Sequence, residues 1–262
     1  DPRGQSVERL RDEGRLLASL NHPVLLKVHD ISDLGGRVAL ITEYIPGQDL
    51  GECLDGDDRI DLRALLQVIA EVAGALHAAW SASTAAGEPL RLVHRDIKPA
   101  NIRIGRHGHV KLLDFGIARS DAMTREAHTA TNMMIGSMPY LAPERFLSDE
   151  PDSASDVFAL GTCLYEGIAG QRYYAEVSPA MLMGLSASPE RFSTYLQERL
   201  DALPDAVPDR VWEALADTLV FEPTGRPSAT ELAARLEALA DEVDGPTLKQ
   251  WCARRSWPET PS

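Results

Sequence analysis

The sequence predicts an α+β protein in which one helix and a strand hairpin precede a larger, mostly helical part. Three observations predict this. Leucines at helical spacing open the chain, two short apolar runs with a polar turn between them follow, and capped amphipathic segments dominate after Asp61. With 262 residues, of which 44% are hydrophobic, the chain is long enough for one domain with its own core.

The first predicted element is an amphipathic helix. Leu10, Leu17 and Leu20 recur at helical spacing, so they share one face. The helix is expected to end near residues 21–23, because Pro23 disfavours the helical conformation at the residue before it.

The second predicted element is a strand hairpin. Residues 25–31 and 37–44 form two short apolar runs, and the polar sequence SDLGG separates them. The second run leads into a connecting segment, the hinge, at residues 43–47.

The remaining elements are predicted mostly as helices, from their caps. Asp61 precedes a segment with one apolar face, and Ser178 precedes a proline at the first helical position. Ser228 and Glu231 have the spacing of a capping box. Three short β-rich runs interrupt this pattern, at residues 91–96, 101–104 and 110–116.

The last residues are predicted less clearly. Residues 244–262 contain Pro246, Trp251, Trp257 and two late prolines. This composition is typical either of a tail packed on the domain or of a linker to a further segment.

Composition excludes several classes of protein and partner. The formal net charge of −14 would repel a phosphate backbone, so we expect no nucleic-acid partner. Three scattered cysteines favour a reduced, cytoplasmic compartment over a disulfide framework. No signal peptide or membrane segment is expected, because the apolar run at residues 157–170 is too short to cross a bilayer and contains Glu166.

The most specific feature is a set of four short motifs. They read HRDIKPAN at His94–Asn101, KLLDFG at Lys111–Gly116, APE at Ala142–Glu144 and GRP at Gly225–Pro227. Any one acid or amide among them would most simply be a loop residue that caps a turn. The agreement of several separate spacings argues against chance assembly.

By these motifs the chain resembles the bacterial eukaryotic-like (Hanks-type) Ser/Thr protein kinase domain, over nearly its whole length. The resemblance starts at the first helix, whose Glu13 matches the glutamate that pairs with a lysine on an earlier strand. We therefore expect the Gly-rich loop and that lysine in a larger polypeptide. The resemblance divides the chain into a partial N-lobe at residues 1–46, a C-lobe at 47–243 and a tail or linker at 244–262.

The resemblance implies a reaction that uses ATP and Mg²⁺ and phosphorylates a protein substrate on serine or threonine. Asp96 matches the aspartate that accepts the proton of the substrate hydroxyl, and Lys98 matches the lysine that steadies the transferred phosphate. Asn101 and Asp114 match the magnesium ligands, which are hard oxygen donors. Glu13 belongs to the same catalytic set.

The nucleotide site is also implied by the resemblance. Thr42 matches the gatekeeper, and Glu43 and Ile45 would offer hinge backbone groups to adenine. Arg103 occupies the position whose apolar side chain usually lies under adenine. Its guanidinium could stack on the base or block the pocket, and both alternatives stay open.

Further residues match regulatory positions. Arg95, before the catalytic aspartate, is typical of kinases in which a phosphate orders the activation loop, and Thr129 and Thr131 are the expected phosphorylation sites. Phe115 matches the DFG phenylalanine, and Ser137 replaces the threonine of the substrate-docking loop. A matched ion pair is expected between the APE and GRP motifs, at the residues Glu144 and Arg226.

Two alternatives to an active Ser/Thr kinase remain. A pseudokinase or interaction platform would keep the large lobe without turnover, because the Gly-rich loop and its lysine are missing from this sequence and Arg103 lies under adenine. A small-molecule phosphotransferase of the aminoglycoside type shares the H-x-D-x-x-x-x-N loop but lacks the APE and GRP motifs present here.

Overall fold

The fold is described here from a computed structural model of the 262-residue chain. The structure describes residues 20, 22–33, 38–84, 86–115, 138–147 and 152–258. The helix predicted around Leu10 and Leu17 lies outside these residues.

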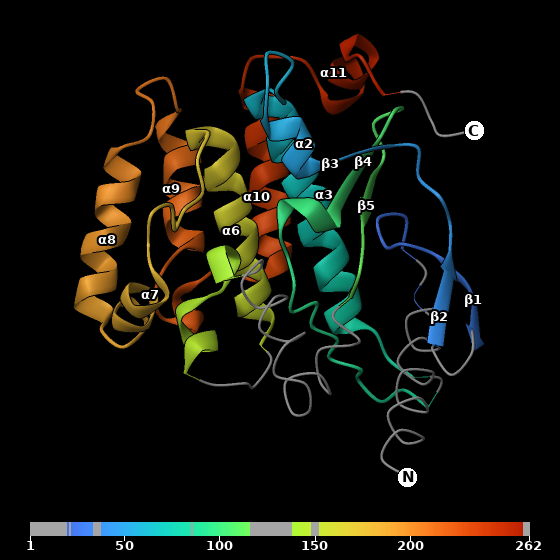
Figure 1. The fold of residues 1–262 in the computed structure, drawn as a ribbon, viewed down its shortest axis with the longest axis horizontal. Coiled ribbons are helices and arrows are strands. Elements are labelled where there is room, and N and C mark those ends of the chain that lie inside the picture. Colours follow the sequence, from blue (N-terminus) through green and yellow to red (C-terminus); the bar gives the residue numbers. More distant parts are fainter. Residues whose placement is uncertain are drawn as a thin grey trace.

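In the described part of the chain, the strands form two small antiparallel sheets (Figure 1). The first is the predicted hairpin, in which β1 (Val28–Asp33) pairs with β2 (Val38–Thr42). The second has the order β3-β4-β5, with β3 at Gly47–Asp49, β4 at Ile102–Gly105 and β5 at Val110–Leu112. Gly47 has to be a glycine, because a Cβ there would lie 2.0 Å from the carbonyl oxygen of Ile104.

The second sheet places the hinge next to the motif residues. β3 follows the hinge directly, and β4 follows the HRDIKPAN motif. Two of the three predicted β-rich runs are therefore confirmed. The strand expected around residues 91–96 is wrong, because this stretch forms no strand in the structure.

The larger part of the molecule is helical, as predicted. Its helices are α2 (Leu50–Leu54), α3 (Leu62–Ser81), α6 (Ser153–Ala169), α7 (Pro179–Ser186), α8 (Pro189–Asp201), α9 (Asp209–Thr218), α10 (Ala229–Glu242) and α11 (Leu248–Arg254). Short 3₁₀ helices lie at η1 (Pro99–Asn101), η2 (Met138–Tyr140), η3 (Pro143–Phe146) and η4 (Pro223–Gly225).

Local caps explain where several helices begin. The Ser178 hydroxyl accepts from the amide of Met181, and Ser228 forms the predicted capping box with Glu231. Asp61 stands at the N-cap of α3 but makes no side-chain capping bond, in contrast to the prediction.

The core is centred on α3. This helix packs against α6, α10 and α11, and eleven of its residues are buried. Among the described residues, α3 is the one helix long and apolar enough to span a membrane by length and composition. Because 61% of its most apolar window is buried inside the protein, its hydrophobicity is accounted for by the core. The apolar run at residues 157–170 lies in and directly after α6, which has 17 residues and is not the helix that meets these criteria.

Candidate active site

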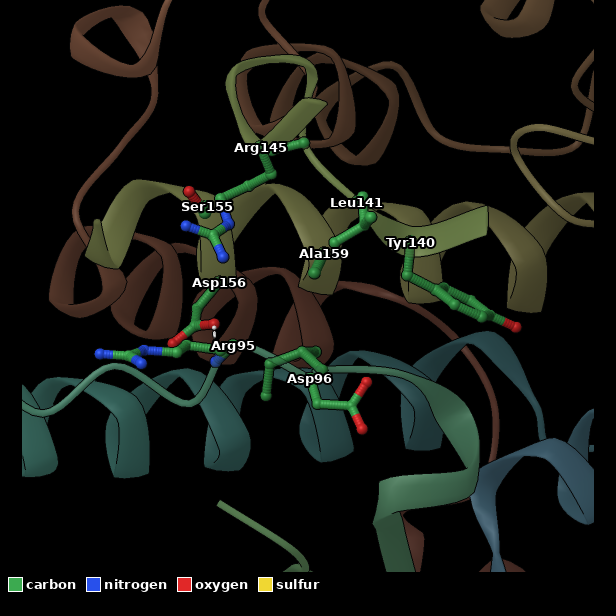
Figure 2. Close-up of a pocket in the computed structure, with 10 residues that line it drawn as sticks. Arg95, Asp96, Tyr140, Leu141, Arg145, Ser155, Asp156 and Ala159 are labelled. Carbon is green, nitrogen blue, oxygen red and sulfur yellow. Dashed lines mark hydrogen bonds between the residues drawn. The ribbon is translucent and has the colours of Figure 1, made fainter. Parts of the chain in front are cut away.

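The loop at residues 94–101 is fixed to the helical part of the protein by Asp156, in the first turn of α6. The two carboxylate oxygens of Asp156 accept hydrogen bonds from the amides of His94 (2.6 Å) and Arg95 (2.9 Å). Figure 2 shows the second of these bonds as a dashed line. Burial raises the pKa of Asp156 to about 7, although both amide bonds favour the charged form. The loop is therefore anchored by a carboxylate that is 4% exposed.

His94 connects this loop to the DFG segment. Its ring is fully buried, and its Nε2 donates to the carbonyl oxygen of Leu113 at 2.8 Å. Its Nδ1 accepts from the amide of Asp96 at 3.3 Å, so the neutral Nε2–H tautomer satisfies both bonds. The ring of Phe115 lies 4.6 Å from the His94 ring, between centroids. One buried side chain thus aligns the two motifs.

The carboxylate of Asp96 is the centre of the candidate active site. Its Oδ2 accepts from the Lys98 ammonium at 3.0 Å and from the Asn101 amide nitrogen at 3.1 Å. The same amide nitrogen also donates to the Asp96 carbonyl at 2.8 Å. Asp96, Lys98 and Asn101, predicted as one constellation, are therefore in direct contact.

Asp96 lies on the floor of a cleft (Figure 2). The opposite wall is formed by residues 140–142, with Arg145 extending from η3 toward Asp156. Arg95 lines the same cleft.

Two motif residues have a strained backbone. Arg95 has φ 68° and Asp114 has φ 51°, in the left-handed region that non-glycine residues rarely adopt. Such conformations cost about 1–3 kcal/mol each and persist where the surroundings impose them. The backbone of Arg95 is held in this conformation by its hydrogen bond to Asp156. Next to Asp114, the Leu113 amide donates to the Asn101 carbonyl at 2.8 Å and holds the preceding residue in place.

The chemistry of Asn101 and Asp114 fits a magnesium ion. Asn101 uses its amide nitrogen for Asp96, so its amide oxygen remains for a metal, while the Asp114 carboxylate is exposed. Two hard oxygen donors suit Mg²⁺, which keeps several of its waters. No cluster of three or more His, Cys, Asp or Glu side chains suited to a metal occurs among the described residues, so a closed, all-protein cage is not built in that part of the chain.

The hinge is held by an ion pair that the sequence did not reveal. The Glu43 carboxylate accepts from Lys111 Nζ at 2.5 Å and from the amide of Lys27 at 2.8 Å. Burial would raise the pKa of Glu43, but these two bonds outweigh it and lower the pKa. The Glu43 amide donates to the Lys27 carbonyl, and Lys111 also reaches the Leu25 carbonyl. The hinge is thus tied to β5 and to the segment before β1, and the Glu43 amide is engaged within the protein.

The other predicted hinge residues lie on either side of Glu43. Thr42 ends β2, where it is half-buried and pairs with Val28, and Ile45 is buried. Tyr44, between them, is 66% exposed.

Arg103 lies on β4, beneath the hinge, and its guanidinium is bound within the protein. Its Nε donates to the Ile45 carbonyl at 3.3 Å, and its Nη1 lies 3.8 Å from the Glu52 carboxylate. Asp49 is its direct partner across the β3-β4 ladder and also caps α2 in a capping box with Glu52. Asp49 and Glu52 were not predicted as site residues, although their D-x-x-E spacing is a signal for this cap.

Four predicted site residues lie outside the described residues. They are Glu13, Thr129, Thr131 and Ser137. The predicted ion pair of the APE and GRP motifs is confirmed, with Arg226 Nη1 at 2.7 Å from Glu144 Oε1.

The comparisons with known proteins agree with the motifs. The sequence matches the family described as "Protein kinase domain" over residues 2–235. It is 34% identical over 246 residues to "Tyrosine-protein kinase MasK" of Myxococcus xanthus. The aligned region covers 90% of this chain and 36% of MasK. It is 36% identical over 225 residues to "Serine/threonine-protein kinase PknA" of Mycobacterium tuberculosis, 84% of this chain and 48% of PknA. "Serine/threonine-protein kinase PknL" of the same species is 33% identical over 253 residues, 96% of this chain and 59% of PknL. The chain therefore spans about a third to three fifths of the length of these relatives.

Proposed function

Since the chain belongs to the protein kinase family, we propose that it transfers the γ-phosphate of ATP to serine and threonine hydroxyls of protein substrates. The observation that carries the proposal is the contact of Asp96 with both Lys98 and Asn101. Phosphoryl transfer needs little covalent chemistry from a protein, so a preorganised set of charges is the main requirement.

Each residue of this set would have a distinct role. The Asp96 carboxylate, fixed by two donors, would orient the substrate hydroxyl and accept its proton. Lys98, 3.0 Å from Asp96, would contact the transferred phosphate. Asn101 and Asp114 would hold Mg²⁺, which neutralises charge on the phosphates when it is bound.

The proposal that serine and threonine, and not tyrosine, accept the phosphate rests on Lys98 and on two of the relatives. A lysine two residues after the catalytic aspartate is typical of Ser/Thr kinases, and PknA and PknL are named as such. MasK is named a tyrosine kinase, so the class has to be tested directly. Phosphoamino-acid analysis of a phosphorylated generic protein should yield phosphoserine and phosphothreonine, and phosphotyrosine alone would contradict the proposal.

Transfer itself is tested with labelled ATP and the full chain. We expect Asp96→Asn to lower the rate at least about 100-fold, because the amide cannot accept the proton. Asp205→Asn, which removes an exposed acid between α8 and α9, is the matched control and should keep the rate of the unmodified protein. Equal rates for Asp96→Asn and the control would contradict the assignment of Asp96.

A second candidate is an interaction platform without turnover, and the position of Arg103 favours it. The Arg103 guanidinium binds the hinge carbonyl of Ile45, at the place expected to face adenine. Titration of the full chain with Mg²⁺ and ATP distinguishes the two functions. Binding by the unmodified protein supports the kinase, whereas binding only after Arg103→Leu supports the platform.

We also propose that a phosphate on the activation loop regulates the activity. Arg95 supports this proposal, because it lines the cleft together with Arg145, and two arginines there favour a phosphate. The expected acceptors, Thr129 and Thr131, are tested by replacing both with alanine. Unchanged loop phosphorylation and unchanged rate would contradict the proposal.

The surroundings of the domain are proposals as well. We propose a cytoplasmic location, which the three buried, unpaired cysteines Cys53, Cys163 and Cys252 support. We propose that the natural protein is a larger polypeptide, because its relatives extend well beyond the matched region.

A further inference from the structure

The C-terminal segment packs on the elements that follow the hinge. We call residues 247–258 the C-terminal brace; they lie beyond residue 235, where the family match ends. Thr247 and Gln250 form a capping box at the start of α11, and Leu248 and Trp251 are buried. Figure 1 shows α11 beside α2 and the tip of the β4-β5 hairpin. Residues 247–258 are therefore packed on the domain.

Several contacts hold the brace in place. The Trp251 indole donates to the Arg59 carbonyl at 3.3 Å, and the Leu248 amide donates to the Gln67 side chain at 2.6 Å. Arg106, in the β4-β5 turn, donates to the Pro258 carbonyl. The brace thus contacts α3, the loop before it and the β4-β5 hairpin.

Arg255 is the residue through which the brace reaches the hinge side of the domain. Its Nε donates to the Gln48 side-chain oxygen at 3.0 Å, and its Nη2 donates to the Glu52 carbonyl at 3.1 Å. Its guanidinium carbon lies 4.9 Å from the ring centre of Trp251 and 5.9 Å from that of Trp257. The planar guanidinium is thus oriented by two aromatic rings, so it loses little conformational freedom when it forms the hydrogen bonds to Gln48 and Glu52.

The partners of Arg255 lead directly to the predicted nucleotide site. Gln48 lies on β3, and Glu52 lies in α2. The Glu52 carboxylate accepts from the Asp49 amide at 2.9 Å and lies 3.8 Å from Arg103, which binds the Ile45 carbonyl. A continuous series of contacts therefore joins Arg255 to the hinge backbone.

We propose that Arg255 is a positioning residue for the nucleotide site, through its hydrogen bonds to the Gln48 side chain and to the Glu52 carbonyl. The inference rests on the proposed function, because it names a determinant of ATP binding in the same site. Arg255 touches neither nucleotide nor substrate hydroxyl; it fixes β3, which begins at the last hinge residue, Gly47, and it thereby fixes the hinge backbone. Loss of Arg255 should therefore weaken ATP binding more than it slows transfer at saturating ATP.

The test compares Arg255→Ala with Arg254→Ala in the full chain. Arg254 lies next to Arg255 at the end of α11 and is exposed, so its replacement removes the same charge without these contacts. We expect Arg255→Ala to raise KM for ATP roughly fivefold, as for the loss of one or two charged hydrogen bonds, with kcat within about twofold. Amide hydrogen exchange at residues 47–54 should be faster than in the unmodified protein. Arg254→Ala should change none of these values.

The variant Leu248→Ala distinguishes a positioning role of Arg255 from a general loss of stability. This variant removes a buried side chain from the same helix but leaves the Arg255 contacts. If Leu248→Ala lowers Tm as much as Arg255→Ala and raises KM equally, Arg255 has no positioning role. Unchanged KM and unchanged exchange in Arg255→Ala would also overturn the inference.

Failure of the proposed function gives a different result. If the unmodified protein binds no ATP and transfers no phosphate, the kinase proposal fails, and with it the link from Arg255 to ATP binding. Hydrogen exchange at residues 47–54 still decides whether Arg255 holds β3 and α2 in place. If exchange is faster in Arg255→Ala but not in Arg254→Ala, Arg255 holds these elements in place. Equal exchange in Arg255→Ala and Arg254→Ala contradicts that role.

Discussion

At the scale of single residues, Asn101 combines two functions in one side chain. Its amide nitrogen donates to the Asp96 carbonyl and carboxylate, which leaves its amide oxygen for the proposed magnesium ion. A residue with two oxygen atoms could bind the metal but could not donate to Asp96. The hydrogen bonds to Asp96 therefore require an amide at this position, and the proposed metal binding is compatible with it.

This leads to a prediction for Asn101→Asp. The new carboxylate keeps a magnesium ligand but faces the Asp96 carboxylate, so we expect the transfer rate to fall about 100-fold. Raising the Mg²⁺ concentration should not restore the rate. In the control Asp114→Asn, which changes the other predicted ligand, higher Mg²⁺ should recover part of the activity. Equal recovery in both variants would show that Asn101 acts only through the metal.

At the scale of elements, the packing of α3 against α10 brings two acidic side chains together. Burial and the nearby Glu237 on α10 raise the pKa of Glu71 on α3 to about 7, while Lys249 on α11 opposes this rise. The folded protein therefore binds a proton at Glu71 more tightly than the unfolded chain does. Between the ordinary pKa near 4.5 and the raised value near 7, the free energy of unfolding should fall as pH rises.

The pH dependence predicts the effect of Glu71→Gln. The amide removes the buried charge, so we expect the variant to be more stable than the unmodified protein by about 1 kcal/mol at pH 7.5, with solvent screening of this partly exposed group taken into account. At pH 4.5 the two should be nearly equal. Urea unfolding between these pH values measures the difference, with the exposed Glu198→Gln as control. Asp156, whose pKa burial also raises to about 7, should leave a residual slope in every variant. A slope that is unchanged in Glu71→Gln would contradict the prediction.

At the scale of the whole molecule, local signals in the sequence were informative and distant contacts were not. The Ser228 cap depends on a residue three positions away and could be predicted. Lys111 and Glu43 are 68 residues apart, and Arg255 and Gln48 are 207 apart, so no spacing rule could pair them. The strand expected near residue 91 was wrong because strands need a partner, and here the backbone of His94 bonds the side chain of Asp156.

The motif residues of the site were predictable for a related reason. Asp96, Lys98 and Asn101 lie within six consecutive residues, so their contacts follow from one short loop. The contacts of the Arg103 guanidinium were not predictable, since they are made with the Ile45 carbonyl and with Glu52, both distant in the sequence. The proposed catalytic residues are thus close together in the sequence, whereas the proposed nucleotide site is assembled by the tertiary fold.

The ion pair of Glu144 with Arg226 joins distant parts of the helical lobe. Arg226 donates to both carboxylate oxygens, at 2.7 and 2.8 Å, and to the carbonyls of Val220 and Phe221. Its side chain is 0% exposed, and burial would raise the pKa of Glu144, but the bonds from Arg226 outweigh burial and lower it. The pair therefore holds η3, which forms a wall of the cleft, against the segment before α10.

We predict that Arg226→Met destabilises the protein by about 3–5 kcal/mol, because it leaves the Glu144 carboxylate partly buried without its partner. The double variant Glu144→Met with Arg226→Met should recover part of this loss, since it leaves no unpaired charge, but the carbonyls that Arg226 satisfied keep it below the unmodified protein. Urea unfolding of the three proteins measures both steps. The control is Arg210→Met, which breaks the exposed pair with Glu242 and should cost less than about 1 kcal/mol. Should Arg226→Met cost no more than this control, the ion pair would not be what holds the cleft wall in place.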